Sequence, residues 1–228
     1  MITPRLQEII NLIKSDSIAD IGTDHAYIPI DLARKGRIKK AIATDLNKGP
    51  IEIAASNVKR YQLDGIIELR IGSGLEPVKV GETKEIIIAG MGGRLICDII
   101  ENSIEKASAS DLILQPMNAQ CELRKKLFEL GFSVEKEALG AEGFKVYNVM
   151  RVIKKSSVAP DKEIYYHLPR ELFSHKFFKM LLEKKEREFN KIINGQKNSA
   201  NPDINILNYY TGLKSELDII KSEIKGKE

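Results

Sequence analysis

The segment Ile18–Tyr27, with the sequence IADIGTDHAY, constrains the fold most, because an apolar run ends there at an acidic residue and a glycine and then enters a helical pattern. A mostly apolar run of this kind is typical of a parallel strand that is buried on both faces. Gly22 permits the sharp exit that a strand-to-helix turn needs. The following pattern predicts a helix over His25–Lys35, with Gly36 beyond its end. The segment therefore predicts a strand, a cofactor-binding turn and a helix.

The chemistry of this turn depends on Asp24. In dinucleotide-binding enzymes the equivalent turn is G-x-G-x-x-G, and its second glycine lets the backbone close on a pyrophosphate. Asp24 occupies that position here. A carboxylate repels a diphosphate and attracts a cationic sulfonium. The turn therefore favours a positively charged nucleoside cofactor without phosphates, and S-adenosylmethionine fits. A degenerate glycine motif is a weak signal, so an ordinary turn that binds nothing is the alternative on this segment alone.

A second acidic residue, Asp45, ends the predicted strand Lys40–Asp45, about twenty residues past Gly22. A carboxylate at the tip of the second strand can accept hydrogen bonds from both ribose hydroxyls of an adenosine. Asp45 is therefore the strongest candidate for a cofactor contact. The alternative is an aspartate that caps the helix predicted over Ile51–Tyr61.

Glycines follow the next two predicted strands. Ile66–Ile71 ends in the loop Gly72–Gly74, which we expect beside the adenine ring. Glu85–Gly93 is the most β-like run in the chain, and its three glycines lie at the carboxyl end, where they let a ligand approach the backbone closely. Tight packing of a helix on the sheet is the alternative, and it accounts for one glycine more readily than for three.

The rest of the first part continues the alternation and then changes. Two β-rich segments follow the last helix without another helix between them, which predicts a hairpin. The expected elements are a helix over Arg94–Ile104, a strand over Asp111–Pro116, a helix over Leu123–Leu130, and strands over Phe132–Ala138 and Lys145–Ile153, joined by the turn Leu139–Gly143. The pattern predicts an α/β fold with a seven-stranded, mostly parallel, Rossmann-like sheet that ends in a hairpin, which is the arrangement of class I methyltransferases.

The composition of the chain excludes several classes of protein. Of 228 residues, 30% are charged and 43% are apolar, no run approaches the length of a membrane span, and no leader-like start is present, so we expect a cytoplasmic protein. Two cysteines, Cys97 and Cys121, are too few for a disulfide framework or a zinc cluster. The three histidines, His25, His167 and His175, are scattered along the chain, so we expect no metal.

The last third of the chain differs in charge and pattern. Residues 1–153 contain 21 basic and 21 acidic residues, whereas residues 154–228 contain 15 and 11. Ser156–Pro160 is typical of a linker, and Pro169–Asn194 and Asn205–Lys225 are amphipathic. In the second stretch apolar residues step by three and four, which predicts an antiparallel helical coiled coil; the positions are Ile206, Tyr210, Leu213, Leu217, Ile220 and Ile224. We expect a methyltransferase domain over 1–155 and a helical domain over 156–228.

Four strings together resemble the bacterial tRNA (adenine-22-N1)-methyltransferases, which join a class I methyltransferase domain to a C-terminal coiled coil. The strings are Asp20–Tyr27 (DIGTDHAY), Ala89–Gly93 (AGMGG), Leu112–Pro116 (LILQP) and Leu123-Arg124. The resemblance covers most of the chain, and the tail matches in architecture. Two positions depart from the pattern: Met117 stands where an asparagine is expected, with Asn118 next, and Ser73 stands where many class I methyltransferases carry an acidic contact to adenine.

The resemblance implies methyl transfer from S-adenosylmethionine to N1 of an adenine in the D-arm of tRNA. The base must leave its pair to expose this edge, and an aromatic ring then holds it by stacking. Tyr27 lies beside the turn and is the candidate, with a core tyrosine as the alternative. The expected catalytic residues are Asp24, Tyr27 and Gln115, and the expected cofactor contacts are Asp20, Gly22, Thr23, His25, Asp45, Leu46, Asn47, Gly72, Ser73, Gly74, Gly90, Met91 and Gly92.

The expected partner is tRNA, with no membrane and with a monomer favoured. We expect the basic tail, rather than the cofactor domain, to contact the RNA. Two other functions stay open from the sequence. One is a class I methyltransferase that acts on another RNA or on a small molecule. The other is a non-catalytic coiled-coil scaffold with a vestigial cofactor site.

Overall fold

The structure, a computed structural model, describes residues 2–225. The chain divides into two compact units, Met1–Glu142 with Tyr147–Val158, and Gly143–Val146 with Ala159–Glu228. The elements in chain order are α1 (Pro4–Leu12), β1 (Ser17–Ile21), α2 (Tyr27–Arg34), β2 (Lys40–Asp45), α3 (Lys48–Arg60), β3 (Ile67–Ile71), β4 (Glu85–Met91), α4 (Gly93–Asn102), α5 (Ile104–Ser108), β5 (Asp111–Pro116), α6 (Gln120–Glu129), β6 (Ser133–Glu142), β7 (Lys145–Ile153), α7 (Ile164–His167), the 3-10 turn η1 (Arg170–Leu172), α8 (Phe178–Lys197) and α9 (Ile204–Lys225).

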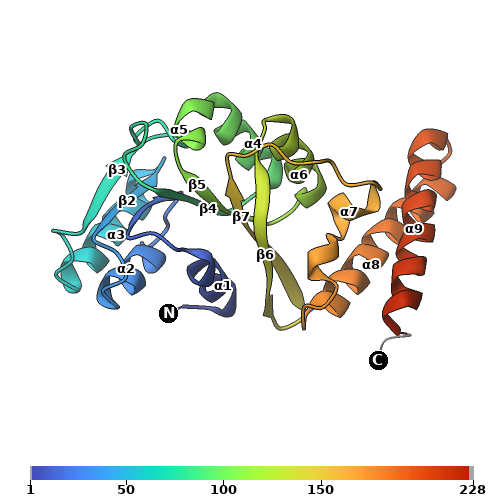
Figure 1. The fold of residues 1–228 in the computed structure, drawn as a ribbon, viewed down its shortest axis with the longest axis horizontal. Coiled ribbons are helices and arrows are strands. Elements are labelled where there is room, and N and C mark those ends of the chain that lie inside the picture. The colour runs from blue at the N-terminus through green and yellow to red at the C-terminus, as the bar shows by residue number, and fades with distance from the viewer. Residues whose placement is uncertain (1, 226–228) are drawn as a thin grey trace. The chain divides into compact units, whose positions relative to one another are not determined.

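The seven strands form one sheet in the order β3-β2-β1-β4-β5-β7-β6 (Figure 1). The five strands β1 to β5 pair in parallel, and β7 pairs antiparallel to β5. The predicted seven-stranded, mostly parallel sheet with a C-terminal hairpin is therefore confirmed. Because the parallel strands share one direction, the ends of β1, β2, β3, β4 and β5 lie along one edge of the sheet, the edge at which open α/β sheets bind their ligands.

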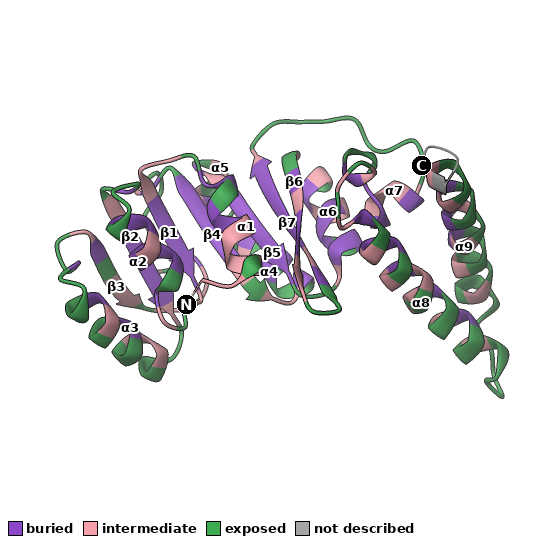
Figure 2. Cartoon of the chain, turned by 90° about the horizontal axis from the view of Figure 1, so that it is seen from below, coloured by how far each residue is buried: buried purple, intermediate pink, exposed green. Residues whose placement is uncertain are grey.

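Helices cover both faces of the sheet. Alternate residues of β1 serve the two sides: Ile18 belongs to the core under α1, α2 and α3, and Ala19 and Ile21 belong to the core under α4, α5 and α6. All three are at most 2% exposed. Figure 2 shows the central strands buried along most of their length. This double coverage is why the central strands are near-continuous apolar runs.

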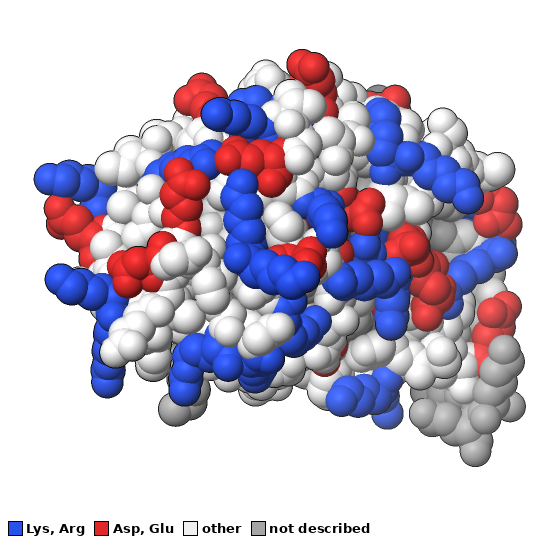
Figure 3. Space-filling view, turned by 60° about the vertical axis from the view of Figure 1, so that its left-hand side comes forward, with Lys and Arg blue, Asp and Glu red and all other residues white. Residues whose placement is uncertain are grey.

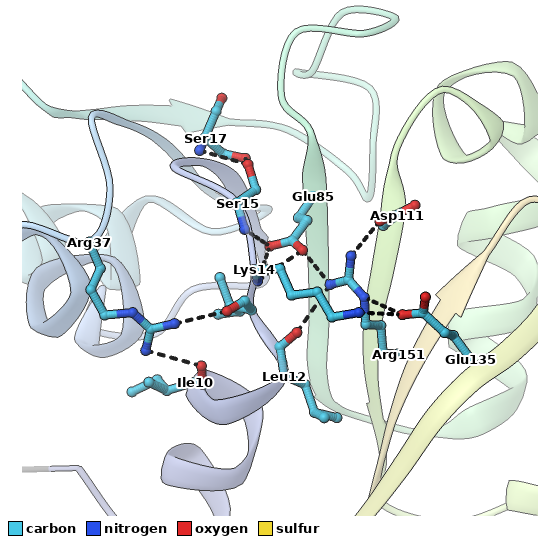
Figure 4. Close-up of polar contacts among 11 residues, drawn as sticks. Ile10, Leu12, Lys14, Ser15, Ser17, Arg37, Glu85, Asp111, Glu135 and Arg151 are labelled. Atoms are coloured by element: carbon cyan, nitrogen blue, oxygen red, sulfur yellow. Dashed lines mark hydrogen bonds and ion pairs between the residues drawn. The ribbon is translucent and has the colours of Figure 1, made fainter.

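Most charged side chains are at the surface, but Arg124 and Glu137 form a buried ion pair, and a larger cluster lies where β4 and β5 begin. On the face drawn in Figure 3, basic side chains are numerous and acidic ones lie among them. In the buried cluster, Arg151 of β7 contacts Glu85, Asp111 and Glu135, and Glu85 also accepts hydrogen bonds from the backbone N–H of Lys14 at 3.0 Å (Figure 4). The cluster ties β7 and the end of α1 to the start of the parallel strands.

The hairpin turn lies later than the sequence predicts. β6 continues to Glu142, and the turn is formed by Gly143 and Phe144, with Gly143 at a φ of +59°. The predicted turn at 139–143 was wrong because Leu139 is fully buried within the strand. Gly140 serves another purpose there: a Cβ atom on it would lie 3.2 Å from the Cα of Arg5, so this glycine lets α1 approach β6 closely.

The ends of several helices also differ from the prediction, and α3 and α6 each begin three residues earlier than expected, at Lys48 and Gln120. The helix predicted over 94–104 ends at Asn102, because Ser103 leaves the helical conformation (φ −133°, ψ 40°) and starts the short helix α5. The helix predicted from Pro169 begins only at Phe178. The intervening backbone forms successive tight turns, in which His175 N donates to Leu172 O and Phe178 N donates to His175 O, both at 2.8 Å.

Within the second unit, α8 and α9 pack as an antiparallel pair. Tyr210 of α9 packs against Phe189 of α8 with the ring centroids 5.7 Å apart and the rings tilted by 59°, and Lys221, further along α9, forms an ion pair with Glu186, earlier on α8, at 2.7 Å. The seam on α9 is buried at Leu213, Leu217 and Ile220, whereas Ile206 is 39% exposed. No helix within residues 2–225 combines the length and apolar character needed to cross a membrane.

Candidate cofactor and substrate site

The turn after β1 is fixed by its own backbone. The N–H groups of Gly22 and Thr23 both donate to Thr44 O at 2.8 Å, which ties the turn to the end of β2. Gly22 has a φ of +74°, and a Cβ atom there would lie 2.2 Å from the Met91 methyl carbon. The backbone conformation therefore favours glycine at this position, and any side chain there would have to displace the end of the Met91 side chain. The sequence prediction of a sharp turn at Gly22 is confirmed.

A buried carboxyl group lies just before the turn. Asp20 is 7% exposed, and burial raises its pKa to about 6, against the opposing effect of a 2.7 Å hydrogen bond from Thr23 Oγ1. The same hydroxyl oxygen accepts a hydrogen bond from Ala26 N at 3.1 Å. Ala26 takes the left-handed conformation, with a φ of +56°. This is why α2 begins at Tyr27 and not at His25, as the periodicity predicted.

The next residues of the turn face outward. Asp24 has a side chain that is 74% exposed, and its Oδ2 lies 3.1 Å from His25 Nε2. The His25 ring stacks on the Tyr27 ring, with centroids 4.9 Å apart and planes 26° apart. Tyr27 is 41% exposed. Tyr27 is therefore a supported surface ring at the start of α2 and not the buried core residue that was the alternative.

A cavity of about 330 Å³ lies at this turn, within the size range of small-molecule sites. Seven of its lining residues are among those that the sequence predicts: Asp20, Gly22, Thr23, Asp24, His25, Tyr27 and Gly90. The other five are not among the predicted site residues: Thr3, Arg5, Leu6, Ile28 and Ala89. Thr3, Arg5 and Leu6 belong to the start of α1, which none of the sequence motifs includes. Thr3 is the N-cap of this helix, with its Oγ1 accepting a hydrogen bond from Leu6 N at 3.4 Å.

The far wall of the cavity is shaped by an irregularity in β4. The pairing of β4 with β5 shifts between Ala89 and Met91, so Gly90 lies in a bulge, with a φ of +77°. Gln115, at the same level of β5, is fully buried and does not line the cavity. Its Oε1 accepts a 2.6 Å hydrogen bond from Arg5 Nη1, and its Nε2 donates to Pro116 O at 3.1 Å. The predicted catalytic Gln115 thus contacts Arg5 in this structure.

The predicted ribose contact lies along the same edge. Asp45 ends β2, and its Oδ1 accepts a hydrogen bond from Asn47 N at 2.8 Å, in the turn before α3. Oδ2 has no hydrogen-bond partner among residues 2–225 and is available to a ligand. Gly72 N donates to Asp45 O at 3.0 Å, so the loop after β3 lies beside the end of β2.

The remaining predicted contacts lie on the loops and strand ends of this edge, outside the cavity lining. Leu46 is 64% exposed, and Asn47 and Ser73 are exposed as well. Met91 packs over Gly22, and Gly92 is the N-cap of α4. Gly74 has a φ of +50° beside Ile99. Asn118, which follows the unexpected Met117, accepts a hydrogen bond from Gly93 N at 3.2 Å.

These residues fit a cationic nucleoside. The edge offers an available carboxylate oxygen at Asp45, two further carboxyl groups at Asp20 and Asp24, and a turn at Gly22 that has no side chain to block a ligand. Carboxylates attract a sulfonium and an ammonium group and repel phosphates. The arrangement therefore suits S-adenosylmethionine better than a dinucleotide.

Comparisons with known proteins agree with this geometry. The family model for the methyltransferase domain matches residues 2–150, and the chain therefore belongs to this family. The tRNA (adenine(22)-N(1))-methyltransferase of Bacillus subtilis (strain 168) is 36% identical over 151 residues, which cover 65% of this chain and 63% of that protein. The matched region thus spans less than two thirds of the length of this relative.

Two solved structures resemble the chain over almost its full length. Streptococcus pneumoniae Sp1610 is 28% identical and has a TM-score of 0.86. The match covers 96% of this chain and 99% of the Sp1610 chain. M. capricolum TrmK, solved with S-adenosyl-homocysteine, is 27% identical and has a TM-score of 0.79. The match covers 99% of this chain and 98% of the TrmK chain. Sp1610 has also been solved with S-adenosyl-L-methionine.

Proposed function

We propose that this chain is an S-adenosylmethionine-dependent methyltransferase that methylates N1 of adenine 22 in bacterial tRNA. The observation that carries the proposal is the match to TrmK, because this match spans the C-terminal helices as well as the methyltransferase domain. The natural cofactor product of TrmK is S-adenosyl-homocysteine. The B. subtilis tRNA methyltransferase supports the same substrate. The cavity at Gly22 and the carboxylates around it supply a matching cofactor site.

The cofactor, when bound, supplies an electrophilic methyl group, so the protein has little acid or base chemistry to perform. Adenine N1 already carries a lone pair, and positioning it against the methyl group is the main task. Tyr27, supported by the stacked His25 ring, holds the extruded base by stacking. The exposed Asp24 carboxylate lies next to these rings and favours the positive charge that develops on the methylated adenine.

We assign RNA backbone contacts to the second unit. Its helix α8 carries exposed basic residues at Lys179, Arg187 and Lys191, and the basic excess of the whole chain lies in residues 154–228. Phosphate contacts of this kind supply affinity without sequence readout. The cofactor-binding residues all precede this unit.

The experiment that tests the reaction is methylation of unmodified tRNA transcripts, followed by nucleoside mass analysis. We expect 1-methyladenine in the wild-type transcript and none when adenine 22 is replaced by guanine. A methylated product at another position, or on another RNA or a small molecule, would select the more general methyltransferase. A protein that fails to bind S-adenosylmethionine in calorimetry would instead be a scaffold with a vestigial site.

The RNA-contact assignment is tested in the full chain. Replacing Lys179, Arg187 and Lys191 with alanine should weaken tRNA binding. The slope of the logarithm of the binding constant against the logarithm of the salt concentration should become shallower by roughly 0.7 to 0.9 for each phosphate that the protein no longer neutralises. The affinity for S-adenosylmethionine should not change. A matched variant that replaces Lys48 and Lys59, exposed on α3, is the control. An unchanged salt slope in the α8 variant would make α8 and α9 a dimerisation element instead.

A further inference from the structure

Arg5 lies in the cavity although no motif includes it. It is in the first turn of α1, directly after Thr3 and Pro4, which start the helix. Its side chain lines the cavity together with Asp20, Thr23 and Gly90. A Cβ atom on Gly90 would lie 3.8 Å from Arg5 Nη1, so the glycine of the bulge faces the guanidinium. The residue therefore belongs to the site by position.

The guanidinium group is held in place. Nη1 donates to Gln115 Oε1 at 2.6 Å, and the Gln115 amide is itself fixed by its 3.1 Å hydrogen bond to Pro116 O. The guanidinium carbon lies 5.8 Å from the centroid of the Tyr147 ring. The backbone N–H of Arg5 donates to Glu142 Oε1 at 3.1 Å, which fixes the start of the helix against β6. The fully buried Gln115 thus fixes the orientation of the Arg5 side chain, and Arg5 itself is half-buried.

The charge of Arg5 has no counterpart within the part of the chain that the structure describes. Arg5 forms no ion pair with residues 2–225, and its Nε and Nη2 atoms make no hydrogen bond there. The cavity lining contains no other arginine and no lysine. His25, which also lines it, lies against Asp24. The cavity therefore combines two carboxyl groups, Asp20 and Asp24, with one fixed cation that has unused donors.

This arrangement matches the charges of the amino-acid end of the cofactor. That end carries a sulfonium and an ammonium group, which suit Asp20 and Asp24, and one carboxylate, which requires a cation or several N–H donors. Arginine presents paired donors in a plane and binds carboxylates in a bidentate manner. We propose that Arg5 binds the α-carboxylate of S-adenosylmethionine, and that Gln115 is the positioning residue that aims Arg5. The proposal rests on the cofactor assigned under the proposed function.

A comparison of two ligands tests the carboxylate directly. S-adenosylmethionine and its decarboxylated form are titrated calorimetrically into the wild-type protein and the Arg5→Met variant. In the wild type, loss of the carboxylate should weaken binding about 10- to 100-fold, the range for a hydrogen-bonded charged group. In Arg5→Met the two ligands should bind with nearly equal affinity. The ratio is read on the ligand-binding fraction of each sample, so partial unfolding of the variant does not affect it.

Two further variants separate charge from geometry. Arg5→Lys keeps the cation but loses the planar pair of donors, and it should retain part of the discrimination. Gln115→Glu leaves Arg5 in place but sets a carboxylate against it, and it should weaken S-adenosylmethionine more than the decarboxylated ligand. Lys59→Met, which removes an exposed cation from α3, should leave both affinities unchanged.

Several outcomes would overturn the inference. An Arg5→Met protein that still discriminates the two ligands, or a wild type that does not, removes the carboxylate from Arg5. If Arg5→Met instead binds both ligands like the wild type but loses tRNA affinity, with a shallower salt slope, the oxyanion that Arg5 binds is an RNA phosphate and the cofactor assignment of Arg5 is wrong. A wild type that binds neither ligand would contradict the proposed function itself.

Discussion

Truncating Tyr27 to alanine should separate a contribution to substrate binding from a contribution to stability. Its ring is 41% exposed and is supported on one face by His25. Removing a fully buried aromatic ring costs about 3–5 kcal/mol of unfolding free energy, so this half-exposed ring should cost roughly half of that, about 1.5–2.5 kcal/mol. Losing the stack with an extruded adenine should cost about 1–3 kcal/mol in the transition state, which is a roughly 5- to 150-fold lower kcat/KM.

The assay measures methyl transfer to tRNA and thermal unfolding on Tyr27→Ala and Tyr27→Phe. The phenylalanine variant keeps the ring and should stay active, because stacking does not need the hydroxyl. Cofactor affinity, measured by calorimetry, should be nearly unchanged in both variants. A Tyr27→Ala protein that unfolds early but keeps full turnover per folded molecule would refute the reasoning and remove Tyr27 from the active site.

Three other substitutions test separate parts of the molecule. Burial raises the pKa of Asp20 from 3.8 to about 6, so the folded state binds this proton more tightly than the unfolded state, and the group should lower the unfolding free energy by about 2 kcal/mol as pH rises from 4 to 6. The ionised form attracts the cationic cofactor, so S-adenosylmethionine affinity should fall by up to tenfold per pH unit below 6, a dependence that Asp20→Asn should abolish in calorimetry. Asp45→Ala should weaken the cofactor by about 1.5–3 kcal/mol for each ribose hydrogen bond that it removes, and unchanged affinity would contradict the ribose assignment. Arg151→Met should lower the unfolding free energy by about 3–5 kcal/mol in chemical denaturation, because Glu85 stays buried without its partner, while a change in cofactor affinity would show that the cluster also shapes the site.

The strands were predictable because they are buried on both faces. β2 and β5 begin and end where the apolar runs predict, at Lys40–Asp45 and Asp111–Pro116. Burial sets the length of these strands, and the apolar residues of a buried strand can be read directly from the sequence. Helix ends depend on single backbone conformations, and the left-handed Ala26 or the break at Ser103 leaves no mark on the periodicity. The start of α2 and the end of α4 therefore could not be read from the pattern.

The candidate site divides in the same way. The turn at Gly22 and the acidic end of β2 were predictable, because each is local to one strand and its exit. The contact between Arg5 and Gln115 joins residues 110 positions apart, and its donor lies in a helix that none of the sequence motifs includes. Gln115 was expected among the catalytic residues, but its burial and its contact with Arg5 became visible only with the fold.

The close packing of α1 against the sheet explains why Arg5, in the first turn of α1, belongs to the site. Gly140 lets the first turn of α1 lie against β6, since a Cβ atom there would meet the Arg5 backbone at 3.2 Å. The bulge at Gly90 places the backbone of β4 beside the guanidinium, at an ordinary van der Waals distance. Of the two glycines, Gly140 is the one whose missing side chain lets the first helix come close enough to place this cation in the cavity. The charge balance of the cavity is therefore set by backbone packing as much as by the residues of the motif.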